Sequence, residues 1–221
     1  MADIKIKDLY SLDETMAKPL LESCEFPWEA LPKIKEFIIE LGKTLPKDEY
    51  EEKGENVWIH KTATIYPTAY IAGPCIIGAN TEVRPSAFVR GSALVGEGCV
   101  VGNSTELKNV ILFNKVQVPH YNYVGDSILG YKAHMGAGSI TSNVKSDKQL
   151  VVVHNEGQNI ETGLKKFGAM LGDNVEVGCN SVLNPGTVIC KESNVYPTSS
   201  VRGVVPASSI HKKTGEIIKK I

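Results

Sequence analysis

Residues 59–107, IHKTATIYPTAYIAGPCIIGANTEVRPSAFVRGSALVGEGCVVGNSTEL, place a large aliphatic side chain at every sixth position. These positions are Ile59, Ile65, Ile71, Ile77, Val83, Val89, Val95, Val101 and Leu107. Four residues after each of the first eight stands a small side chain: Ala63, Ala69, Cys75, Thr81, Ala87, Ala93, Cys99 and Thr105. Neither the 3.6-residue period of a helix nor the two-residue period of a strand produces this repeat. The pattern is typical of a parallel β-helix built from hexapeptides, three to a triangular coil.

The same period returns near the end of the chain. Its aliphatic positions are Leu171, Val177, Leu183, Ile189, Val195 and Val201. We therefore predict an all-β fold with the parallel β-helix at residues 56–207 and a tail at 208–221.

Residues 1–55 have a different composition. Ser11-Leu-Asp-Glu14 resembles a helix capping box, and Ile34, Phe37, Ile38 and Leu41 recur at helical spacing. We expect a short α-helical segment that caps one end of the β-helix and covers its unpaired edge.

The repeat is interrupted in two ways. The steps from Leu107 to Leu112 and from Val124 to Leu129 are five residues long, so one corner is predicted to be shortened in two successive coils. At 142–168 the repeat stops, and QLVVVHNEGQNIETGLKKFG predicts a hairpin that turns at Asn155-Glu156-Gly157. Excursions from solenoids often carry function.

Composition excludes several classes of protein. The net charge of −1 over 221 residues argues against broad binding to nucleic acids or anionic membranes. No apolar run is long enough to cross a membrane, and the first ten residues do not form a signal peptide. The five cysteines are scattered without a Cys-x-x-Cys pair, which favours a reduced, cytoplasmic protein.

Two cations occupy equivalent positions on the repeat. Arg90 follows Val89 and Lys108 follows Leu107, so we expect their side chains to lie about 4.8 Å apart on adjacent coils. A bound phosphate would relieve their repulsion, and two solvated surface charges are the alternative. His120 comes twelve residues later and is a candidate general base, or else a structural histidine.

The run PHYNYVGDSILGYKAHMGAGSITSN at 119–143 resembles the left-handed β-helix acyltransferases. It is most similar to the acetyltransferase domain of the bifunctional glucosamine-1-phosphate acetyltransferase and N-acetylglucosamine-1-phosphate uridylyltransferase family. The block KKFGAMLGDNVEVGCNSVLNPGTVI at 165–189 extends the similarity. The resemblance implies a left-handed helix, an acetyl-CoA co-substrate, an amino-sugar phosphate acceptor and a homotrimer with sites between subunits.

The resemblance also implies roles for individual residues. His120 matches the general base. Arg90, Lys108 and Tyr123 match phosphate-binding positions, and Lys166 matches a substrate-site lysine. Ala137, Asn143 and Cys179 fall at or near coenzyme-binding positions, and we expect backbone N–H groups of Gly136–Gly138 to stabilise an oxyanion.

Three departures from the family pattern bear on function. His134 stands at a substrate-binding position that is usually asparagine, and Cys179 and Pro197 replace small residues near the coenzyme. The first fifty-odd residues contain no nucleotide-binding loop, so we expect no uridylyltransferase activity.

Two other functions remain open. One is a non-catalytic sugar-phosphate-binding protein or trimeric scaffold. The other is a γ-type zinc carbonic anhydrase, although the five histidines lack the close-spaced pair that such a site uses. We predict no metal site.

Overall fold

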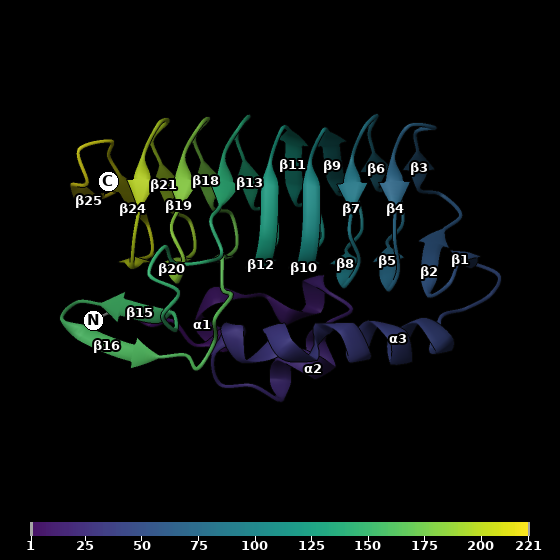
Figure 1. The fold of residues 1–221 in the computed structure, drawn as a ribbon, viewed down its shortest axis with the longest axis horizontal. Helices are drawn as coiled ribbons and strands as arrows, with labels where there is room; N and C mark the ends of the chain where they lie inside the picture. Colours follow the sequence, from purple (N-terminus) through teal and green to yellow (C-terminus); the bar gives the residue numbers. More distant parts are fainter. Residues whose placement is uncertain (1, 221) are drawn as a thin grey trace.

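The computed structural model describes residues 2–220 and contains a left-handed parallel β-helix with three walls (Figure 1). The front wall, named for its place in Figure 1, consists of β4 (Tyr70–Ile71), β7 (Phe88–Val89), β10 (Glu106–Leu112), β12 (Tyr123–Leu129), β14 (Ile140–Thr141), β19 (Val182–Leu183) and β22 (Ser200–Val201). The back wall consists of β3 (Thr64–Ile65), β6 (Glu82–Val83), β9 (Val100–Asn103), β11 (Gln117–His120), β13 (His134–Met135), β18 (Glu176–Val177), β21 (Asn194–Val195) and β24 (Ser209–His211).

The third wall, which we call the covered wall, packs against the N-terminal helices. It contains β2 (Val57–His60), β5 (Cys75–Ile77), β8 (Ala93–Val95), the ends of β10 and β12, β17 (Ala169–Leu171), β20 (Thr187–Ile189) and β23 (Val204–Val205). Antiparallel strands flank the solenoid: β1 (Tyr50–Gly54) pairs with β2, and β25 (Ile217–Lys219) pairs with β24.

The predicted sixfold repeat is confirmed by the packing. Aliphatic residues such as Val83, Val101 and Leu107 are fully buried, and Thr81 and Thr105 fill small positions of the interior. Ile65 and Ile71 are only partly buried because they lie in the first coil, where the helix interior opens. One large side chain per wall therefore fills the narrow interior.

The shortened corner is also confirmed. Leu107 pairs with Val124 and Leu112 pairs with Leu129, so β10 and β12 each run from the front wall into the covered wall. Asn109 and Asp126 occupy this corner with φ values of 54° and 47°. Short polar side chains tolerate this left-handed conformation better than bulky ones, because they can form local hydrogen bonds.

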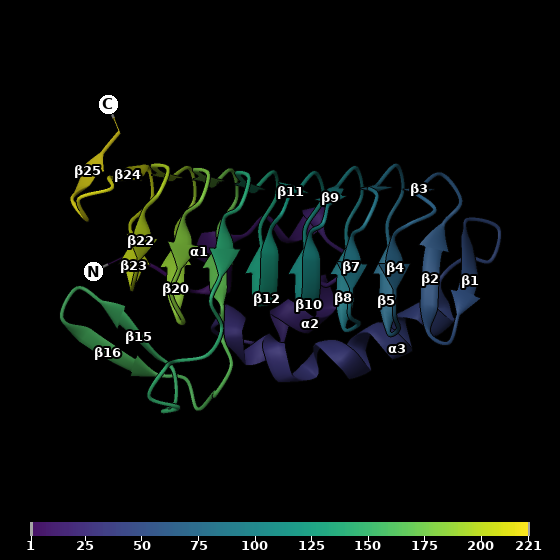
Figure 2. The ribbon, with the colours of Figure 1, turned by 45° about the horizontal axis from the view of Figure 1, so that its top comes forward.

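The N-terminal segment lies along a wall and does not cover an end of the solenoid (Figure 2). Its elements are α1 (Ile6–Leu9), η1 (Leu12–Glu14), α2 (Lys18–Glu22), η2 (Pro27–Lys33) and α3 (Ile34–Thr44). The prediction that this segment caps an end is wrong. The covered wall is apolar on its outer face as well as on its interior face, so the helices pack against that outer face. That face carries the fully buried residues Ile76, Leu94, Ile111, Ile128, Met170 and Val188.

The helix α3 contacts β5, β8 and β10, and η2 contacts β12. Gly42 of α3 allows the closest approach, because a Cβ there would lie 2.2 Å from the ring of Trp58. The predicted capping box at Ser11–Glu14 is not formed; Ser11 instead binds the Asp173 carboxylate through its N–H at 2.8 Å and its hydroxyl at 2.7 Å. These contacts join the segment to the solenoid.

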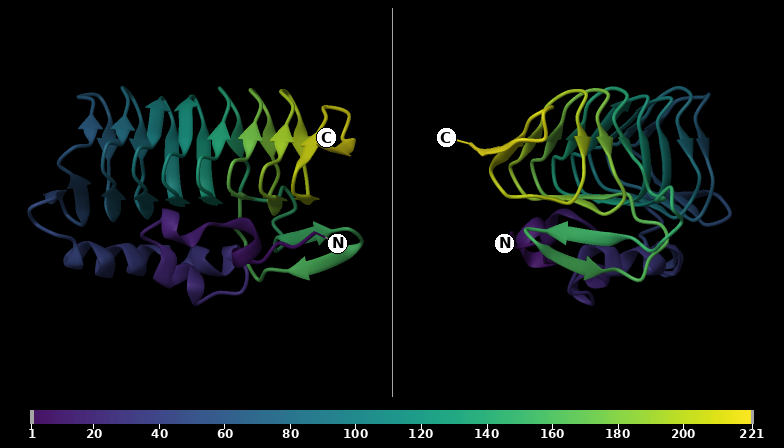
Figure 3. Two further views of the ribbon diagram at one scale, coloured as in Figure 1. Left: turned by 180° about the vertical axis from the view of Figure 1, so that it is seen from behind. Right: turned by 60° about the vertical axis from the view of Figure 1, so that its left-hand side comes forward.

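The excursion forms the predicted hairpin, with β15 (Val152–Asn155) paired to β16 (Gln158–Glu161). It lies on the same side of the solenoid as the N-terminal helices (Figure 3). The predicted tail at 208–221 is partly wrong, since β24 continues the back wall and places the buried His211 beside Val195. The repeat was missed there because a histidine occupies the aliphatic position.

The cysteines are free thiols within the described residues. Burial raises the pKa of Cys75 and of Cys99 to about 12, in agreement with their predicted role as small interior side chains. Cys179 is exposed, whereas Cys190 is buried beneath the N-terminal segment, with its Sγ 3.7 Å from the Asp3 carbonyl oxygen. Among residues 2–220, no helix is long and apolar enough to span a membrane.

Candidate functional site

One edge of the solenoid, between the back and front walls, aligns the predicted catalytic and coenzyme residues. The Gly138 N–H donates to the His120 carbonyl at 3.0 Å, and the Asn180 N–H donates to the Ala137 carbonyl at 2.8 Å. The Thr198 N–H continues the series by donating to the Cys179 carbonyl at 2.8 Å. His120, Ala137, Cys179 and Pro197 therefore stand on successive coils at one edge.

The His120 imidazole is exposed and has no hydrogen-bond partner within residues 2–220. Only its backbone is fixed, because its N–H donates to Asn122 Oδ1 at 3.1 Å. The buried Asn122 amide in turn donates to the Gly136 and Ser139 carbonyls at 2.9 and 3.0 Å. Asn122 thus holds the turn that presents the imidazole to solvent.

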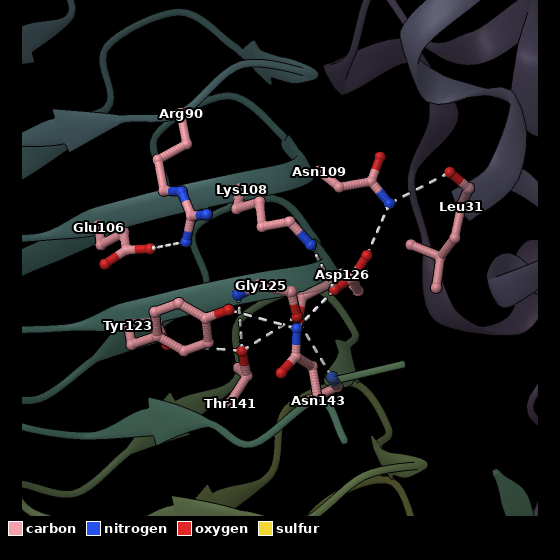
Figure 4. Close-up of polar contacts among 12 residues, drawn as sticks. Leu31, Arg90, Glu106, Lys108, Asn109, Tyr123, Gly125, Asp126, Thr141 and Asn143 are labelled. Atoms are coloured by element: carbon pink, nitrogen blue, oxygen red, sulfur yellow. Dashed lines mark hydrogen bonds and ion pairs between the residues drawn. The ribbon is translucent and has the colours of Figure 1, made fainter. Parts of the chain in front are cut away.

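The predicted pair of cations is present on the front wall. Leu107 pairs with Val89, and the Arg90 N–H donates to the Leu107 carbonyl at 2.9 Å, which places Arg90 and Lys108 on adjacent coils. Each cation has a carboxylate partner: Arg90 Nη1 lies 2.7 Å from Glu106 Oε1, and Lys108 Nζ lies 3.5 Å from Asp126 Oδ2 (Figure 4). The Glu106 contact raises the pKa of Arg90.

Asp126 is the centre of this front-wall cluster (Figure 4). Its side chain is only 7% exposed, and it accepts hydrogen bonds from Asn109 Nδ2 at 2.9 Å and from Asn143 Nδ2 at 2.5 Å. Asn109 Nδ2 also lies 3.2 Å from the Leu31 carbonyl oxygen. The cluster is thereby connected to the N-terminal segment.

Tyr123 lies across the same wall. Its hydroxyl accepts a hydrogen bond from Asn143 Nδ2 at 3.2 Å, and burial raises the pKa of the phenol, with a further contribution from Asp126. Gly125 makes this position possible, because a Cβ at Gly125 would lie 2.5 Å from the Tyr123 hydroxyl.

His134 lies away from this cluster, on the back wall. Its Nδ1 is 2.7 Å from Glu176 Oε2 on the next coil, with which it is in register. Both residues line a groove of about 740 Å³ together with Gly98, Lys115, Gln117 and Lys132. We call this the back-wall groove.

The structure divides the predicted site residues into three groups. Arg90, Lys108, Tyr123 and Asn143 form the front-wall cluster, and His120, Ala137 and Cys179 share the edge; His134 lies in the back-wall groove. Asn143 is thus separated from the other two predicted coenzyme residues. Lys166 is exposed, and the following Phe167 N–H donates to the Asn143 carbonyl at 3.0 Å, so the excursion returns beside the front-wall cluster.

The oxyanion role predicted for the backbone N–H groups of Gly136–Gly138 is contradicted at Gly136 and Gly138 and stays a prediction at Ala137. The Gly136 N–H donates to the Val177 carbonyl at 2.7 Å, and the Gly138 N–H is bound to His120. Both donors are used by the hydrogen bonds between coils. The Ala137 N–H between them has no acceptor within residues 2–220.

Sequence reasoning missed Glu106, Asn109 and Asp126. Glu106 lies two residues before Lys108, so both side chains project from the same face of a strand. Asn109 and Asp126 stand inside the two five-residue steps, where a corner has to be made. Their positions in the repeat were the sequence signals from which these three residues could have been found. Among residues 2–220, no group of three or more His, Cys, Asp or Glu side chains is arranged to hold a metal ion.

Comparison with known families matches residues 71–216 to the model described as the GMPPB C-terminal domain. The chain belongs to this family. The matched GMPPB C-terminal domain contains the front-wall cluster, the edge with His120 and the back-wall groove.

The resemblance inferred from the sequence is confirmed by curated relatives. The chain is 36% identical over 120 residues to the "Bifunctional protein GlmU" of Methanococcus vannielii, covering 54% of this chain and 29% of the relative. It is 33% identical over 155 residues to the "Bifunctional sugar-1-phosphate nucleotidylyltransferase/acetyltransferase" of Sulfurisphaera tokodaii, covering 70% of this chain and 38% of the relative. The chain thus spans about a third of the length of these relatives.

Solved structures with a related fold include a hexapeptide transferase family protein from Anaplasma phagocytophilum. It has a TM-score of 0.42 and 18% identity, and the match covers 75% of this chain and 80% of that one. Another is a point mutant of the GDP-perosamine N-acetyl transferase of Caulobacter crescentus, in complex with CoA and GDP-perosamine. Its TM-score is 0.31 at 17% identity, with coverage of 73% of this chain and 56% of that one.

Proposed function

We propose that this protein is an acetyl-CoA-dependent N-acetyltransferase that acts on an amino-sugar phosphate such as glucosamine 1-phosphate. It would serve the biosynthesis of nucleotide sugars of the UDP-N-acetylglucosamine type, as a homotrimer in the cytoplasm. The proposal rests chiefly on the position of His120. It shares an edge of the solenoid with Ala137 and Cys179, and this edge borders the front wall that contains Arg90 and Lys108. The name of the Sulfurisphaera tokodaii relative, which combines sugar 1-phosphate with acetyltransferase, supports this class of substrate.

In the proposed reaction, the amine of the sugar attacks the thioester carbonyl of acetyl-CoA. A C–N bond forms, the C–S bond breaks, and His120 accepts the proton that the amine loses. That proton then neutralises the departing thiolate, so that coenzyme A leaves as a thiol. An exposed imidazole without a competing partner suits this role, because histidine is the side chain that most often transfers protons in catalysis.

Arg90 and Lys108 bind the phosphate of the acceptor in this proposal, and Tyr123 donates a hydrogen bond to it. The contact of Lys108 is the weaker of the two, because its 3.5 Å distance to Asp126 is long for a charge-assisted hydrogen bond. Arg90 is 45% exposed, so its pairing with Glu106 is screened by water and a phosphate can compete for it.

The carboxylates favour a second candidate function. Because Glu106 and Asp126 already neutralise the two cations, the cluster is stable without an anion and is compatible with a non-catalytic scaffold. An acetyltransferase turns over acetyl-CoA, and a non-catalytic scaffold does not. Purified protein incubated with acetyl-CoA and a panel of amino-sugar phosphates should release free coenzyme A thiol with at least one acceptor, and thiol release with none of them would favour the scaffold.

The same panel tests the substrate class. An unphosphorylated amino sugar should be a poor acceptor, because it lacks the group that the cations bind. Uridylyltransferase activity, measured as pyrophosphate release from UTP and a sugar 1-phosphate, should be absent from this chain.

A further inference from the structure

We propose that the back-wall groove is a second phosphate site, which binds the diphosphate group of a nucleotide through Lys115 and Lys132. The two lysines lie at one corner of the solenoid, between the covered and back walls, on adjacent coils. The Lys132 N–H donates to the Asn114 carbonyl at 3.1 Å, and the Lys115 N–H donates to the Glu97 carbonyl at 2.7 Å. The site goes beyond the proposed acetyl transfer and does not depend on it.

The two ammonium groups converge on one aromatic ring. Lys115 Nζ lies 5.6 Å from the centre of the Tyr131 ring, Lys132 Nζ lies 5.1 Å from it, and Lys115 Nζ donates to the Tyr131 hydroxyl at 3.3 Å. Coils are about 4.8 Å apart, which suits two ammonium groups that bind neighbouring phosphoryl groups.

Neither lysine is neutralised. Across residues 2–220, no ion pair joins Lys115 or Lys132 to a carboxylate, in contrast to Arg90 and Lys108. The acidic groups nearby have other partners: Glu176 binds His134 at 2.7 Å, and the buried Asp173 lies 3.2 Å from Lys191 Nζ. With His134 neutral, two lysines and one glutamate leave the groove lining with a formal charge of +1.

The corner uses lysine where the backbone favours other residues. Lys115 and Lys132 have φ values of 60° and 58°, a left-handed conformation that glycine and asparagine adopt more readily. Equivalent corners of other coils carry Asn80, Gly98, Asn174, Glu192 and Ser208 in the same conformation. Lysine is thus placed at two adjacent corners at a cost in local conformational energy.

The size and position of the groove favour a nucleotide over a single phosphate. A volume of about 740 Å³ falls within the range of small-molecule sites. Gln117, which lines the groove, and His120 lie at the two ends of β11, three residues or roughly 10 Å apart. A diphosphate in the groove is therefore on the same wall as the proposed catalytic edge, but separate from the front-wall cluster.

The test is calorimetric titration of the full chain with UDP, without acetyl-CoA or acceptor. Each of Lys115→Gln and Lys132→Gln should weaken UDP binding by about tenfold or more, as expected for loss of one charge-assisted contact. Lys148→Gln is the matched control, because Lys148 is also an exposed lysine with a left-handed φ of 59°. This variant should bind UDP as tightly as the wild type does. The double variant Lys115→Arg/Lys132→Arg keeps both charges and should retain binding within about threefold.

Three results would overturn the proposal: no UDP binding by the folded wild type, equal loss in Lys148→Gln, or inorganic phosphate bound as tightly as UDP. Arg90→Gln should leave UDP affinity unchanged, and an equal loss in that variant would assign UDP to the front-wall cluster. Because no turnover is measured, failure of the acetyltransferase proposal leaves this test intact.

A second arm identifies the source of the nucleotide. UDP-glucosamine and acetyl-CoA are supplied together, and thiol release is followed. If Lys132→Gln raises the KM for UDP-glucosamine by about tenfold, the nucleotide is part of the acceptor. If UDP binds to the groove and an amino-sugar phosphate is acetylated but UDP-glucosamine is not, the ligand is a free nucleotide.

Discussion

The front-wall cluster and the back-wall groove each present two cations on adjacent coils, but they differ in what surrounds the charges. Arg90 and Lys108 have carboxylate partners at 2.7 and 3.5 Å, and Asp126 connects Lys108 to the N-terminal segment through Asn109. Lys115 and Lys132 instead flank an aromatic ring. The two pairs therefore differ both in their position on the repeat and in whether carboxylates of neighbouring coils neutralise them.

The largest expected effect concerns His120, which stands at the edge between the front and back walls. His120→Ala should lower turnover by about 100-fold or more, the usual contribution of a positioned general base. The affinity of the folded variant for a sugar phosphate and for UDP should be unchanged, since neither pair of cations is altered. Turnover is measured as thiol release.

His154→Ala is the control for this experiment, because His154 is an exposed histidine of the hairpin whose Nδ1 binds Asn159 at 2.7 Å. Normal turnover in folded His120→Ala would show that His120 is not the general base.

The next effect distinguishes the two pairs of cations. Arg90→Ala or Lys108→Ala should weaken binding of a phosphorylated amino sugar by about 10- to 150-fold, from the loss of one contact of about 1.5–3 kcal/mol. An unphosphorylated amino sugar should be affected far less, so the ratio of the two kcat/KM changes is the measurement. Equal losses on both acceptors would show that the cluster is structural.

A smaller effect, on stability, should separate Asp126 from Glu176. Asp126→Asn replaces a buried acceptor of three side-chain contacts and should lower the free energy of unfolding by about 1–3 kcal/mol. Glu176→Gln, whose side chain is 54% exposed, should change it by no more than about 0.5 kcal/mol. Urea denaturation of both variants measures the two changes in the free energy of unfolding. Similar changes would contradict the expectation that the buried carboxylate contributes more to stability than the exposed one.

The smallest effect is a pH dependence of stability at Tyr123. Burial raises the pKa of this phenol in the folded protein, so the unfolded chain loses its proton first as pH rises. The free energy of unfolding should therefore fall as pH rises above about 10, the ordinary value for tyrosine. The free energy of unfolding of Tyr123→Phe, measured by urea titration below and above that pH, should fall less than that of the wild type. Tyr121→Phe, at a site that is 65% exposed, is the control and should behave as the wild type does.

Much of the fold could be predicted because the interior accepts one aliphatic side chain per hexapeptide. The repeat determined the register of Arg90 with Lys108, and the two five-residue steps located the corner of Asn109 and Asp126. The repeat describes only inward positions, so the place of the N-terminal helices was missed. Outward residues such as Ile76, Leu94 and Ile111 carried that information, since large apolar side chains on an outer face require a cover.

The candidate site was predictable only where backbone register decides it. The shared edge of His120, Ala137 and Cys179 follows from counting residues along the coils. The partners of the cations do not, because Glu106 and Asp126 reach them through side-chain conformations that a repeat pattern does not specify. The groove was missed because Lys115 and Lys132 lie at a corner, outside the inward positions that the repeat describes.

The docking of the N-terminal segment has a consequence for biosynthesis. Ser11 binds Asp173 across 162 residues of sequence, and the Ala2 N–H donates to Asn155 Oδ1 across 153. During synthesis Ala2 and Ser11 therefore find these partners only after Asn155 and Asp173 have left the ribosome. At about 5–20 residues per second, synthesis of the 162 residues between Ser11 and Asp173 takes roughly 8 to 32 seconds. The helix α3 is made before β5, β8 and β10, so these strands can pack against it as they emerge, whereas the contacts of Ala2 and Ser11 form last.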